Sequence, residues 1–494
     1  MKVTLLILMF GWTVGAAESH NASDGFNNKK SDLLIKMAND KSISTLLMDL
    51  DNKNVKTEAL GGSWVRVQGD SKSLLFKSLS KNPNVEYVQP NYPVHLMNDY
   101  KLQDNLRRAA VSRFIQAHPE KLLTVPADNP PIPLVVPPQS QGPDVQFPKQ
   151  WGMNDIGAKD AWKKATGEGI IVAVIDTGVD YTHEDLLPNM WKNPGETGTD
   201  SQGRDKATNA VDDDNNGFID DVVGWDFVSN DNKPFDLAVE PLQLLVGGGN
   251  PGHGTHCAGN VGARGDNGIG ISGVAPKVKI MALRFISDKG QGSTADAIKA
   301  IHYAVDNGAK VLSNSWGSEG EDPADGTENK ALRDAVQYAQ DKNVLFVAAA
   351  GNGHSGAGYS NDSDPKPSYP ATYDFENIVS VAAVDSSNNL GSFSNWGTKT
   401  VHLAAPGVAV FSTTVGGLYS DTVIDQYGFH ATWDGTSMAC PHVAGAAALY
   451  WSMHPEKTYK EVKEALLKSA KKIPSLSGKL VSEGKLDVKA LIEQ

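Results

Sequence analysis

The stretch IIVAVIDTGVD, residues 170–180, is the most informative part of this chain. Its first six residues are apolar and mostly β-branched, as expected for a strand that is buried on both faces. Strands of this kind belong to parallel sheets covered by helices, and open α/β sheets place their ligand sites at the carboxyl ends of the strands. Because Asp176 stands at that end, the stretch predicts a buried parallel strand that delivers a carboxylate to a functional site.

Two further motifs carry side chains that complete a reactive group. The motif GHGTHCAG holds His253 and GTSMACPHVAG holds Ser437, and each runs into a segment rich in Ala, Gly and Val that predicts a helix. A serine hydroxyl is a weak nucleophile that needs a base, and the base needs a partner that fixes its tautomer. Asp176, His253 and Ser437 supply these three groups. Taken singly, each motif is equally consistent with a polar helix cap.

Together, and in the chain order Asp, His, Ser, the motifs resemble the subtilisin-like serine protease family. The resemblance extends over residues 144–494 and implies a serine endopeptidase that hydrolyses polypeptide substrates through an acyl-enzyme. It also implies that Asn352, in VLFVAAAGN, donates to the oxyanion together with the Ser437 N–H. As a turn residue, Asn352 would be unremarkable.

The same resemblance assigns a substrate-binding region with two groups of residues. The first group is expected to pair with the substrate backbone as an additional strand and to form one wall of the primary specificity pocket. The second group is expected to form the opposite wall and the floor. The first group is Ser315, Trp316 and Gly317, and the second is Ala349, Ala350, Gly351 and Ser368. None is charged, so we expect apolar or aromatic side chains before the scissile bond, although Trp316 is bulkier than the aliphatic residue often found there.

The composition of the whole chain limits its partners. With 494 residues and a net charge of −13, the chain suits neither nucleic acid nor an anionic membrane surface. Residues 1–17 have the pattern of a secretory signal, because Lys2 precedes an apolar run that ends in Gly15-Ala16-Ala17. The run is shorter than the roughly 20 apolar residues that span a bilayer. We therefore expect a secreted monomer without membrane insertion or a nucleic-acid partner.

Strand and helix signals divide the remaining chain into three parts. Residues 31–97 alternate short strands with a helix, which predicts a small α+β unit. Residues 98–143 are rich in proline after a short basic helix over 102–118, which predicts an extended linker. Alternating strands and helices over residues 144–494 predict an α/β catalytic domain with a doubly wound, mostly parallel sheet.

The first of these parts resembles the family's inhibitory propeptide, above all in NPNVEYVQPNYPVHL, residues 82–96. An unrelated accessory domain is the alternative. The resemblance implies that the propeptide is an intramolecular inhibitor and is removed by self-cleavage near His95–Tyr100. A second cut before Asp144 would remove the linker.

Only two cysteines occur, Cys257 and Cys440, which is too few for a disulfide framework. They fit separate buried thiols, one disulfide between two helices, or a catalytic or metal-binding role. In the last case, His253, His256 and Cys257 would bind zinc in a metal hydrolase, although no HExxH motif is present. A catalytically silent scaffold that binds peptides or calcium is the other alternative to a serine protease.

An acidic, glycine-rich insertion separates the Asp and His motifs and predicts a structural calcium ion. VDDDNNGFIDD, residues 211–221, spaces oxygen ligands as in the first half of an EF-hand loop, although Val223 stands at the twelfth position. The candidate ligands are Asp212, Asp214, Asn216, the Phe218 carbonyl and Asp220. The family resemblance adds a second calcium site at Asp185 and Asn267. A solvated acidic loop is the alternative reading of the insertion.

Overall fold

The computed structural model describes most of the chain, and its described part begins after the predicted signal, residues 1–17. Parts of the predicted linker also lie outside it. The described residues are 31–38, 55–69, 72–97, 100–102, 104–119, 129–138, 140–319, 329–426 and 428–494.

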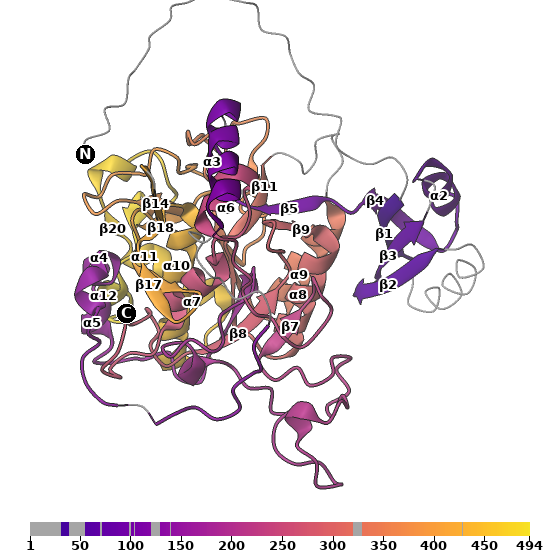
Figure 1. Cartoon of the computed structure of the whole chain (residues 1–494), viewed down its shortest axis with the longest axis horizontal. Helices are drawn as coiled ribbons and strands as arrows, with labels where there is room; N and C mark the ends of the chain where they lie inside the picture. Colours follow the sequence, from indigo (N-terminus) through magenta and orange to yellow (C-terminus); the bar gives the residue numbers. More distant parts are fainter. Residues whose placement is uncertain are drawn as a thin grey trace, which may run out of the picture.

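A nine-stranded sheet forms the centre of the molecule (Figure 1). Its strand order is β20-β21-β15-β14-β12-β10-β6-β8-β7, and each adjacent pair is parallel except β20–β21. The strand predicted from residues 170–175 is β6 (Ile171–Asp176), which lies between β10 (Val311–Asn314) and β8 (Lys279–Arg284). The other strands of this sheet are β7 (Gly224–Asp226), β12 (Leu345–Ala349), β14 (Ile378–Val384), β15 (Leu403–Pro406), β20 (Lys471–Lys472) and β21 (Gly484–Lys485).

Helices cover both faces of this sheet. α7 and α10 share a core with the Val172 and Val174 side chains of β6. α8 and α9 share a second core with Ala173 and Ile175. Alternate residues of one strand therefore enter opposite cores, and the predicted doubly wound, mostly parallel α/β fold is confirmed. The bounds of the helices are α7 (His253–Gly262), α8 (Thr294–Asp306), α9 (Lys330–Asp341) and α10 (Thr436–Met453).

The residues before the linker form a small unit of their own. Its sheet has the order β2-β3-β1-β4, with β2 as a strand that the sequence analysis did not anticipate. The unit rests on α8 and α9, where Lys299 pairs with Glu58 at 2.6 Å and the Gln89 amide donates to Asn329 at 2.8 Å. Its elements are β1 (Ser31–Met37), β2 (Lys56–Gly61), β3 (Trp64–Gly69), α2 (Lys72–Leu79) and β4 (Val85–Pro90).

The next strand of the chain leaves this unit and enters the large one. β5 (Pro93–Leu96) lies between β11 (Trp316–Glu319) and β9 (Gln291–Ser293) and is antiparallel to both. β13 (Ser368–Tyr369) completes this four-stranded sheet on the far side of β11. Figure 1 shows β5 as the connection between the two units. The register pairs Trp316 with Leu96 and Gly317 with His95.

The described parts of the linker also contact the large unit. The helix predicted over residues 102–118 is α3 (Asn105–Ala117), which packs on α6 (Pro241–Gly247). Further along, the Tyr181 hydroxyl donates to the Pro130 carbonyl at 2.6 Å. The linker therefore follows the surface of the large unit on both sides of residues 120–128.

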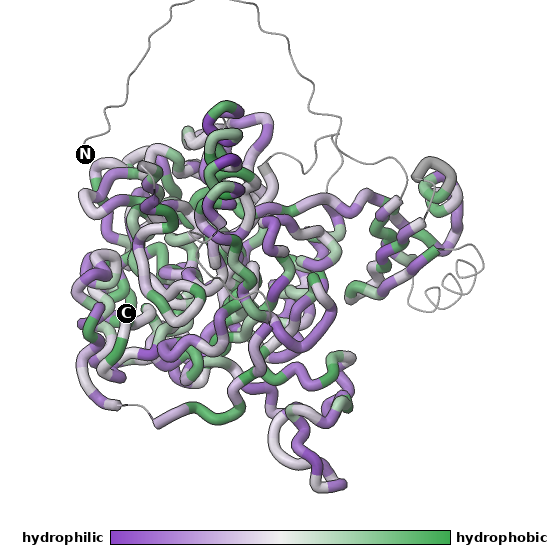
Figure 2. The backbone as a smooth tube through the Cα atoms, in the orientation of Figure 1, coloured by the Kyte–Doolittle hydropathy of each residue, from purple (hydrophilic) through white to green (hydrophobic). Residues whose placement is uncertain are grey.

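Short elements complete the described chain, and the acidic insertion extends from its body. Figure 2 shows the insertion as a largely hydrophilic segment. In the part of the chain that the structure describes, no helix has the length and apolar character needed to cross a bilayer. The remaining elements are η2 (Phe147–Lys149), α4 (Trp151–Asp155), α5 (Ala158–Ala161), η3 (Leu187–Asn189), η4 (Lys206–Thr208), β16 (Ser412–Thr414), β17 (Leu418–Ser420), β18 (Thr422–Gln426), β19 (Phe429–Thr432), α11 (Tyr459–Ser469), η5 (Pro474–Leu476) and α12 (Val488–Leu491).

Candidate active site

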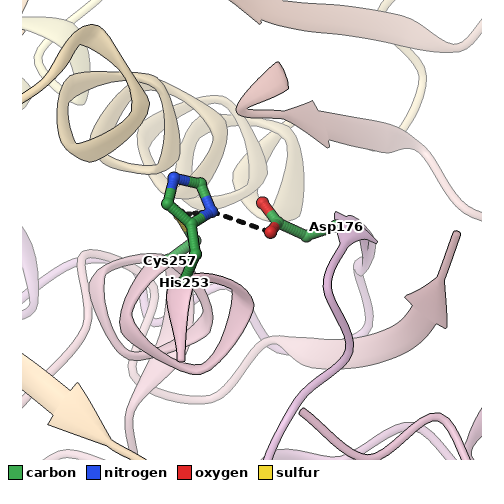
Figure 3. Close-up of side chains that lie close together, drawn as sticks. All are labelled: Asp176, His253 and Cys257. Atoms are coloured by element: carbon green, nitrogen blue, oxygen red, sulfur yellow. Dashed lines mark hydrogen bonds and ion pairs between the residues drawn. The ribbon is translucent and has the colours of Figure 1, made fainter. Parts of the chain in front are cut away.

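The predicted carboxylate and base form a buried pair. Asp176 is the last residue of β6 and His253 is the first residue of α7, and both side chains are buried. His253 Nδ1 lies 2.7 Å from Asp176 Oδ1 (Figure 3). Because an ionised carboxylate only accepts hydrogen bonds, Nδ1 carries the proton and Nε2 is left as the basic nitrogen. Nε2 is buried and has no hydrogen-bond partner among the described residues.

The predicted nucleophile lies at the start of α10. Ser437 is fully buried, and its Oγ donates to the Ser315 carbonyl at 3.0 Å. The Ser315 hydroxyl in turn donates to the Ser437 carbonyl at 2.9 Å. These two bonds hold the serine against the segment predicted to bind substrate. Transfer of the Ser437 proton to a base therefore requires the hydroxyl to leave the Ser315 carbonyl, a change that active sites often undergo when substrate binds.

A buried carboxylate outside the three motifs ties β6 to α7. Asp236 Oδ1 accepts hydrogen bonds from Thr177 Oγ1 at 2.8 Å and from Asn250 Nδ2 at 2.7 Å. Asp236 Oδ2 accepts from the N–H and the hydroxyl of Thr255 at 2.8 and 2.7 Å. Thr177 directly follows Asp176 in the chain. Asn250 Oδ1 accepts from the His253 N–H at 2.9 Å. Asp236 thus holds the ends of both elements that carry the pair.

The burial of Asp236 has an electrostatic cost that its four donors reduce. Removal from water raises the pKa of this carboxyl to about 6, against the lowering effect of Thr255, Asn250 and Thr177. No sequence motif marks Asp236, which stands in the segment NKPFDLAVE. Only its convergence with residues from three other segments identifies it as a positioning residue.

The Asn352 side chain is fixed to the start of α10. Its Oδ1 accepts from the Thr436 N–H at 2.9 Å and from the Thr436 hydroxyl at 2.8 Å. With the amide oxygen held there, the amide NH₂ group is directed away from Thr436. Residue 437 follows directly, in the first turn of a helix, where backbone N–H groups have no intrahelical acceptor. The Asn352 side chain and the Ser437 N–H therefore both lie at the start of α10, where the sequence predicted the oxyanion donors.

Three of the predicted substrate-binding residues, Gly317, Gly351 and Ser368, lie close together, and the Met97 methyl group lies against Gly317. A Cβ atom at Gly317 would lie 2.4 Å from the Met97 methyl carbon and 2.6 Å from the Tyr369 carbonyl oxygen. A Cβ atom at Gly351 would lie 2.9 Å from Ser368 Cβ, and Gly351 has a φ of +110°. Any larger residue at either position would fill this space. The Ser368 hydroxyl is buried without a partner among the described residues.

The Trp316 side chain lies in the core and not at the wall of the specificity pocket that the sequence predicted. It is fully buried and packs edge-on against Phe285, with the ring centroids 4.9 Å apart. The side chains of Ala349 and Ala350 are also fully buried. Trp316 therefore contributes its backbone to the pairing with β5 and its side chain to the core, so its bulk does not limit the pocket.

The geometry around the cysteines separates the alternatives left open by the sequence. Cys257 and Cys440 are both free and buried, so they form no disulfide. Cys257 Sγ lies 3.8 Å from His253 Nδ1, on the side already taken by Asp176, and 3.4 Å from the Ser437 carbonyl (Figure 3). Burial raises the pKa of the Cys257 thiol well above its ordinary value. The sulfur is thus a neutral neighbour of the pair.

The second histidine of the proposed zinc set turns away from the first. His256 Nε2 bonds the Val410 carbonyl at 2.9 Å, and its ring stacks on Trp433 at 4.2 Å between centroids. Burial lowers the pKa of His256 to about 3, which keeps the imidazole neutral. This contact pattern gives His256 a structural role, and it does not support a zinc site formed with His253.

The acidic insertion brings two of the predicted ligands together with a third carboxylate that the sequence did not predict. Ligand oxygens of Glu196, Asp212 and Asp214 all lie within 4.8 Å of one another. Glu196 is buried, and its Oε2 has no partner among the described residues. Burial raises the pKa of Glu196, and the nearby Asp214 adds to that effect. A hard divalent cation that prefers oxygen ligands fits this set, because it would neutralise the crowded charges and partner the orphaned oxygen.

The other predicted ligands of this loop have different contacts. Asn216 lies beside the cluster, and its side chain donates to Asp221 at 3.0 Å, while the Phe218 ring packs among aromatic residues. The structure does not bring Asp220 into the cluster, because both of its carboxylate oxygens accept from the Ala210 N–H at 3.2 Å. The neighbouring Asp221 is fully buried instead, and burial raises its pKa to about 7.

Asp185 and Asn267 come together as predicted. The Asn267 amide donates to Asp185 at 2.7 Å, and burial raises the pKa of Asp185 to about 7. Asp144, which the sequence analysis treated as a domain boundary, accepts from the Asn267 N–H at 3.1 Å and adds its charge to the effect on Asp185. The Asn267 Oδ1 accepts from the Ile269 N–H at 3.1 Å, so the groups that fit a second divalent cation here are the two buried carboxylates and an amide oxygen that now has a backbone partner.

Comparisons with known proteins agree with this fold. A profile of the Subtilase family matches residues 167–485. Thermitase from Thermoactinomyces vulgaris is 35% identical over 325 residues, which cover 66% of this chain and 89% of thermitase. A thermophilic serine proteinase from Bacillus sp. (strain AK1) is 36% identical over 325 residues, which cover 66% of this chain and 62% of that protein.

Among solved structures, the crystal structure of fervidolysin from Fervidobacterium pennivorans, a keratinolytic enzyme related to subtilisin, matches with a TM-score of 0.65 and 22% identity. The match covers 96% of this chain and 62% of the fervidolysin chain. The fold and the arrangement of the site define a serine endopeptidase of the α/β class. The chain belongs to the subtilase family.

Proposed function

We propose that this subtilase is a secreted endopeptidase, made as a self-processing precursor, that cleaves polypeptides with a triad of Ser437, His253 and Asp176. The observation that carries the proposal is the 2.7 Å contact between Asp176 and His253 Nδ1, which leaves a buried Nε2 next to the start of α10. Such a pair fixes the tautomer that a serine nucleophile needs. A signal in residues 1–17 would direct export.

In the acylation step, Ser437 Oγ attacks the scissile carbonyl carbon while His253 Nε2 takes the hydroxyl proton. Asp176 stabilises the imidazolium that forms. The carbonyl oxygen becomes an oxyanion, which accepts hydrogen bonds from the Asn352 amide and the Ser437 N–H. The imidazolium then gives its proton to the leaving amine as the C–N bond breaks. Water repeats the sequence on the acyl-enzyme and releases the acid product.

The register of β5 supports self-cleavage after Met97. Leu96 pairs with Trp316 and His95 with Gly317, so the next residue of the strand, Met97, comes opposite Ser315. Ser315 and Ser437 are joined by two hydrogen bonds, in which the hydroxyl of each residue donates to the carbonyl of the other. With its methyl group against Gly317, Met97 takes the position of the residue before the scissile bond. This bond falls within the range predicted from the sequence.

Calcium is the proposed structural cofactor, with one ion at Glu196, Asp212 and Asp214 and a second at Asp185, Asn267 and Asp144. These residues would hold the ions, and calcium would supply positive charge to the carboxylates gathered there. None of these groups contacts the proposed triad, so their role is in stability. The protein's partners are polypeptide substrates and its own residues 31–97, and we propose a monomer.

Labelling with a fluorophosphonate probe tests the function most directly. The matured protein is expected to be labelled at Ser437, and Ser437→Ala is expected to lose both labelling and hydrolysis. The precursor carrying Ser437→Ala is expected to remain uncut in a host without other proteases. Labelling elsewhere in the chain, or chelator-sensitive hydrolysis without labelling, would refute the serine mechanism.

A further inference from the structure

The chain beyond β5 leads directly to a helix that no step of the proposed mechanism uses. We propose that residues 100–117 are a second inhibitory segment, which occupies the leaving-group side of the cleft and stays attached after the first self-cleavage. This inference rests on the proposed function, because it assumes that Met97 precedes the scissile bond. It adds a binding groove for an apolar helix face and a second stage of activation.

The direction of the chain places the segment on the leaving-group side. β5 carries the residues before the proposed scissile bond, so the chain after Met97 corresponds to the residues of a substrate beyond that bond. By residue 102 the chain has reached α6, where the Leu102 N–H donates to the Leu245 carbonyl at 2.9 Å. The space that a longer substrate needs beyond its scissile bond therefore holds this chain's own backbone.

An apolar face fastens α3 to the large unit. Val111 is only 7% exposed, and Phe114 and Ile115 pack into the same cluster. The cluster is completed by buried apolar side chains of α6 and β18. They are Leu242, Leu244, Leu245 and Ile424. Leu106, on the same helix, is 82% exposed, so α3 presents one apolar face to this groove and a largely polar face to solvent.

The walls of this groove are continuous with the catalytic residues. α6 ends shortly before His253, and the β18–β19 hairpin leads through Trp433 to Ser437. The Trp433 ring centroid lies 6.5 Å from that of His253. α3 and α6 lie side by side in Figure 1, in agreement with their contacts. A helix packed on these walls therefore lies on the segments that lead to His253 and Ser437, while the contact between Asp176 and His253 is intact.

Contacts downstream of α3 keep the segment attached after the first cut. The Pro130 carbonyl accepts from Tyr181, and the Pro133 carbonyl accepts from Lys192 at 3.0 Å. Cleavage after Met97 releases residues 31–97 but leaves α3 joined to the large unit through residues 129–143. A tethered ligand has a high effective concentration, so even weak packing keeps the groove occupied. Full activity on long substrates then requires a second cut between α3 and the large unit.

The test compares two variants of the enzyme that has been cut only after Met97. Val111→Asp puts a charge into the groove contact, and Leu106→Asp puts the same charge on the exposed face of the same helix. Each is assayed with a short peptide that has a small chromogenic leaving group and with a quenched peptide that extends well beyond the scissile bond. Val111→Asp is expected to raise kcat/KM for the extended peptide by roughly tenfold or more and to leave the short peptide unchanged.

Leu106→Asp is expected to change neither rate. An unchanged ratio of the two rates in Val111→Asp would overturn the inhibitory role. A synthetic peptide of residues 100–118 provides a second test that does not depend on folding of the variant. It is expected to inhibit the fully processed enzyme on the extended peptide only, and absence of inhibition would also overturn the proposal. If neither substrate is hydrolysed and Ser437 is not labelled, the proposed function itself fails.

Discussion

The catalytic centre and the acidic insertion both bury carboxylates, but they balance the charge in different ways. At the centre, Asp176 and Asp236 accept hydrogen bonds from imidazole, hydroxyl, amide and backbone donors. In the insertion, Glu196, Asp212 and Asp214 lie within 4.8 Å of one another, and one Glu196 oxygen has no partner. Charges at this separation repel by about 1 kcal/mol in water and more strongly at lower dielectric. The carboxylates of the centre therefore each have donors within the protein, whereas the insertion leaves a carboxylate oxygen that the proposed cation would satisfy.

The largest expected effect comes from removing the nucleophile. Ser437→Ala is expected to lower kcat by about 10⁶-fold, because the substitution removes the proposed nucleophile. The substitution removes one oxygen from a buried site whose charges are balanced, so the fold is expected to remain. Steady-state hydrolysis and circular dichroism check the two expectations. A loss of activity that accompanies unfolding would show that the centre also depends on this hydroxyl for its stability.

Removal of the oxyanion donor is expected to have the next largest effect. Asn352→Ala is expected to lower kcat by about 10²–10³-fold with little change in KM, because the donor acts chiefly once the oxyanion forms. Asn307→Ala removes an amide at the end of α8 and serves as the control, with kcat unchanged. Equal losses in both variants would assign Asn352 a merely structural role.

Asp236→Asn tests whether the buried carboxylate positions the catalytic pair. Loss of an acceptor shared by Thr177, Asn250 and Thr255 is expected to displace the pair and to lower kcat by about ten- to a hundredfold. Asp226, which pairs with Arg284 at 2.6 Å, offers a matched buried carboxylate. Asp226→Asn is expected to lower the melting temperature without this loss of kcat. The rate of probe labelling at Ser437 measures the positioning directly, and an unaltered rate in Asp236→Asn would contradict it.

Calcium removal is expected to act on the insertion and not on the chemistry. Binding to the native state alone stabilises by about 2.7 kcal/mol at a hundredfold excess over Kd, so chelator is expected to lower the melting temperature. The double variant Asp212→Ala/Asp214→Ala and the variant Glu196→Gln are expected to show a smaller chelator effect than the wild type. A chelator effect of wild-type size in these variants would leave the insertion as a solvated loop. No chelator effect in the wild type would exclude both calcium sites.

The smallest expected effect is a pH dependence of the calcium stabilisation. Burial raises the pKa of Asp185 to about 7 and that of Asp144 to about 6, so the metal-free folded state binds more protons than the unfolded state between about pH 4 and 7. The stability that this protonation provides is present at low pH and is lost as the pH rises through 7. The gain in melting temperature on adding calcium is therefore expected to grow between about pH 5 and 8.

Buried histidines act in the opposite direction on total stability. Burial lowers the pKa values of His256 and His402 to about 3, so their contribution rises as the pH increases toward the ordinary histidine value. The contribution of these histidines is expected to be the same with and without calcium. The difference between the melting temperatures with and without calcium therefore reports the effect of the carboxylates. A calcium gain that shrinks between pH 5 and 8 would contradict the raised carboxyl pKa values.

The sequence by itself determined the sheet and the candidates for the reactive residues. The run at residues 170–175 predicted β6, because only a strand with both faces covered tolerates consecutive apolar, β-branched residues. The motifs predicted that Asp176 stands at the end of a strand and that His253 and Ser437 stand at the starts of helices. The three residues do lie at the end of β6 and at the starts of α7 and α10. The helix over 102–118 was also predicted, since its periodicity is local.

Tertiary structure alone decided which side chains meet. Asp236 and Glu196 stand outside every motif, and only the folded chain brings them to the histidine helix and to the acidic loop. Asp220 has the spacing of a ligand, yet its carboxylate accepts from the Ala210 N–H instead. Local sequence fixes whether a segment is buried and how it is hydrogen-bonded along the backbone. The partner of a buried polar side chain depends on segments that are distant in sequence, because each buried charge is satisfied by whichever donors the packing supplies.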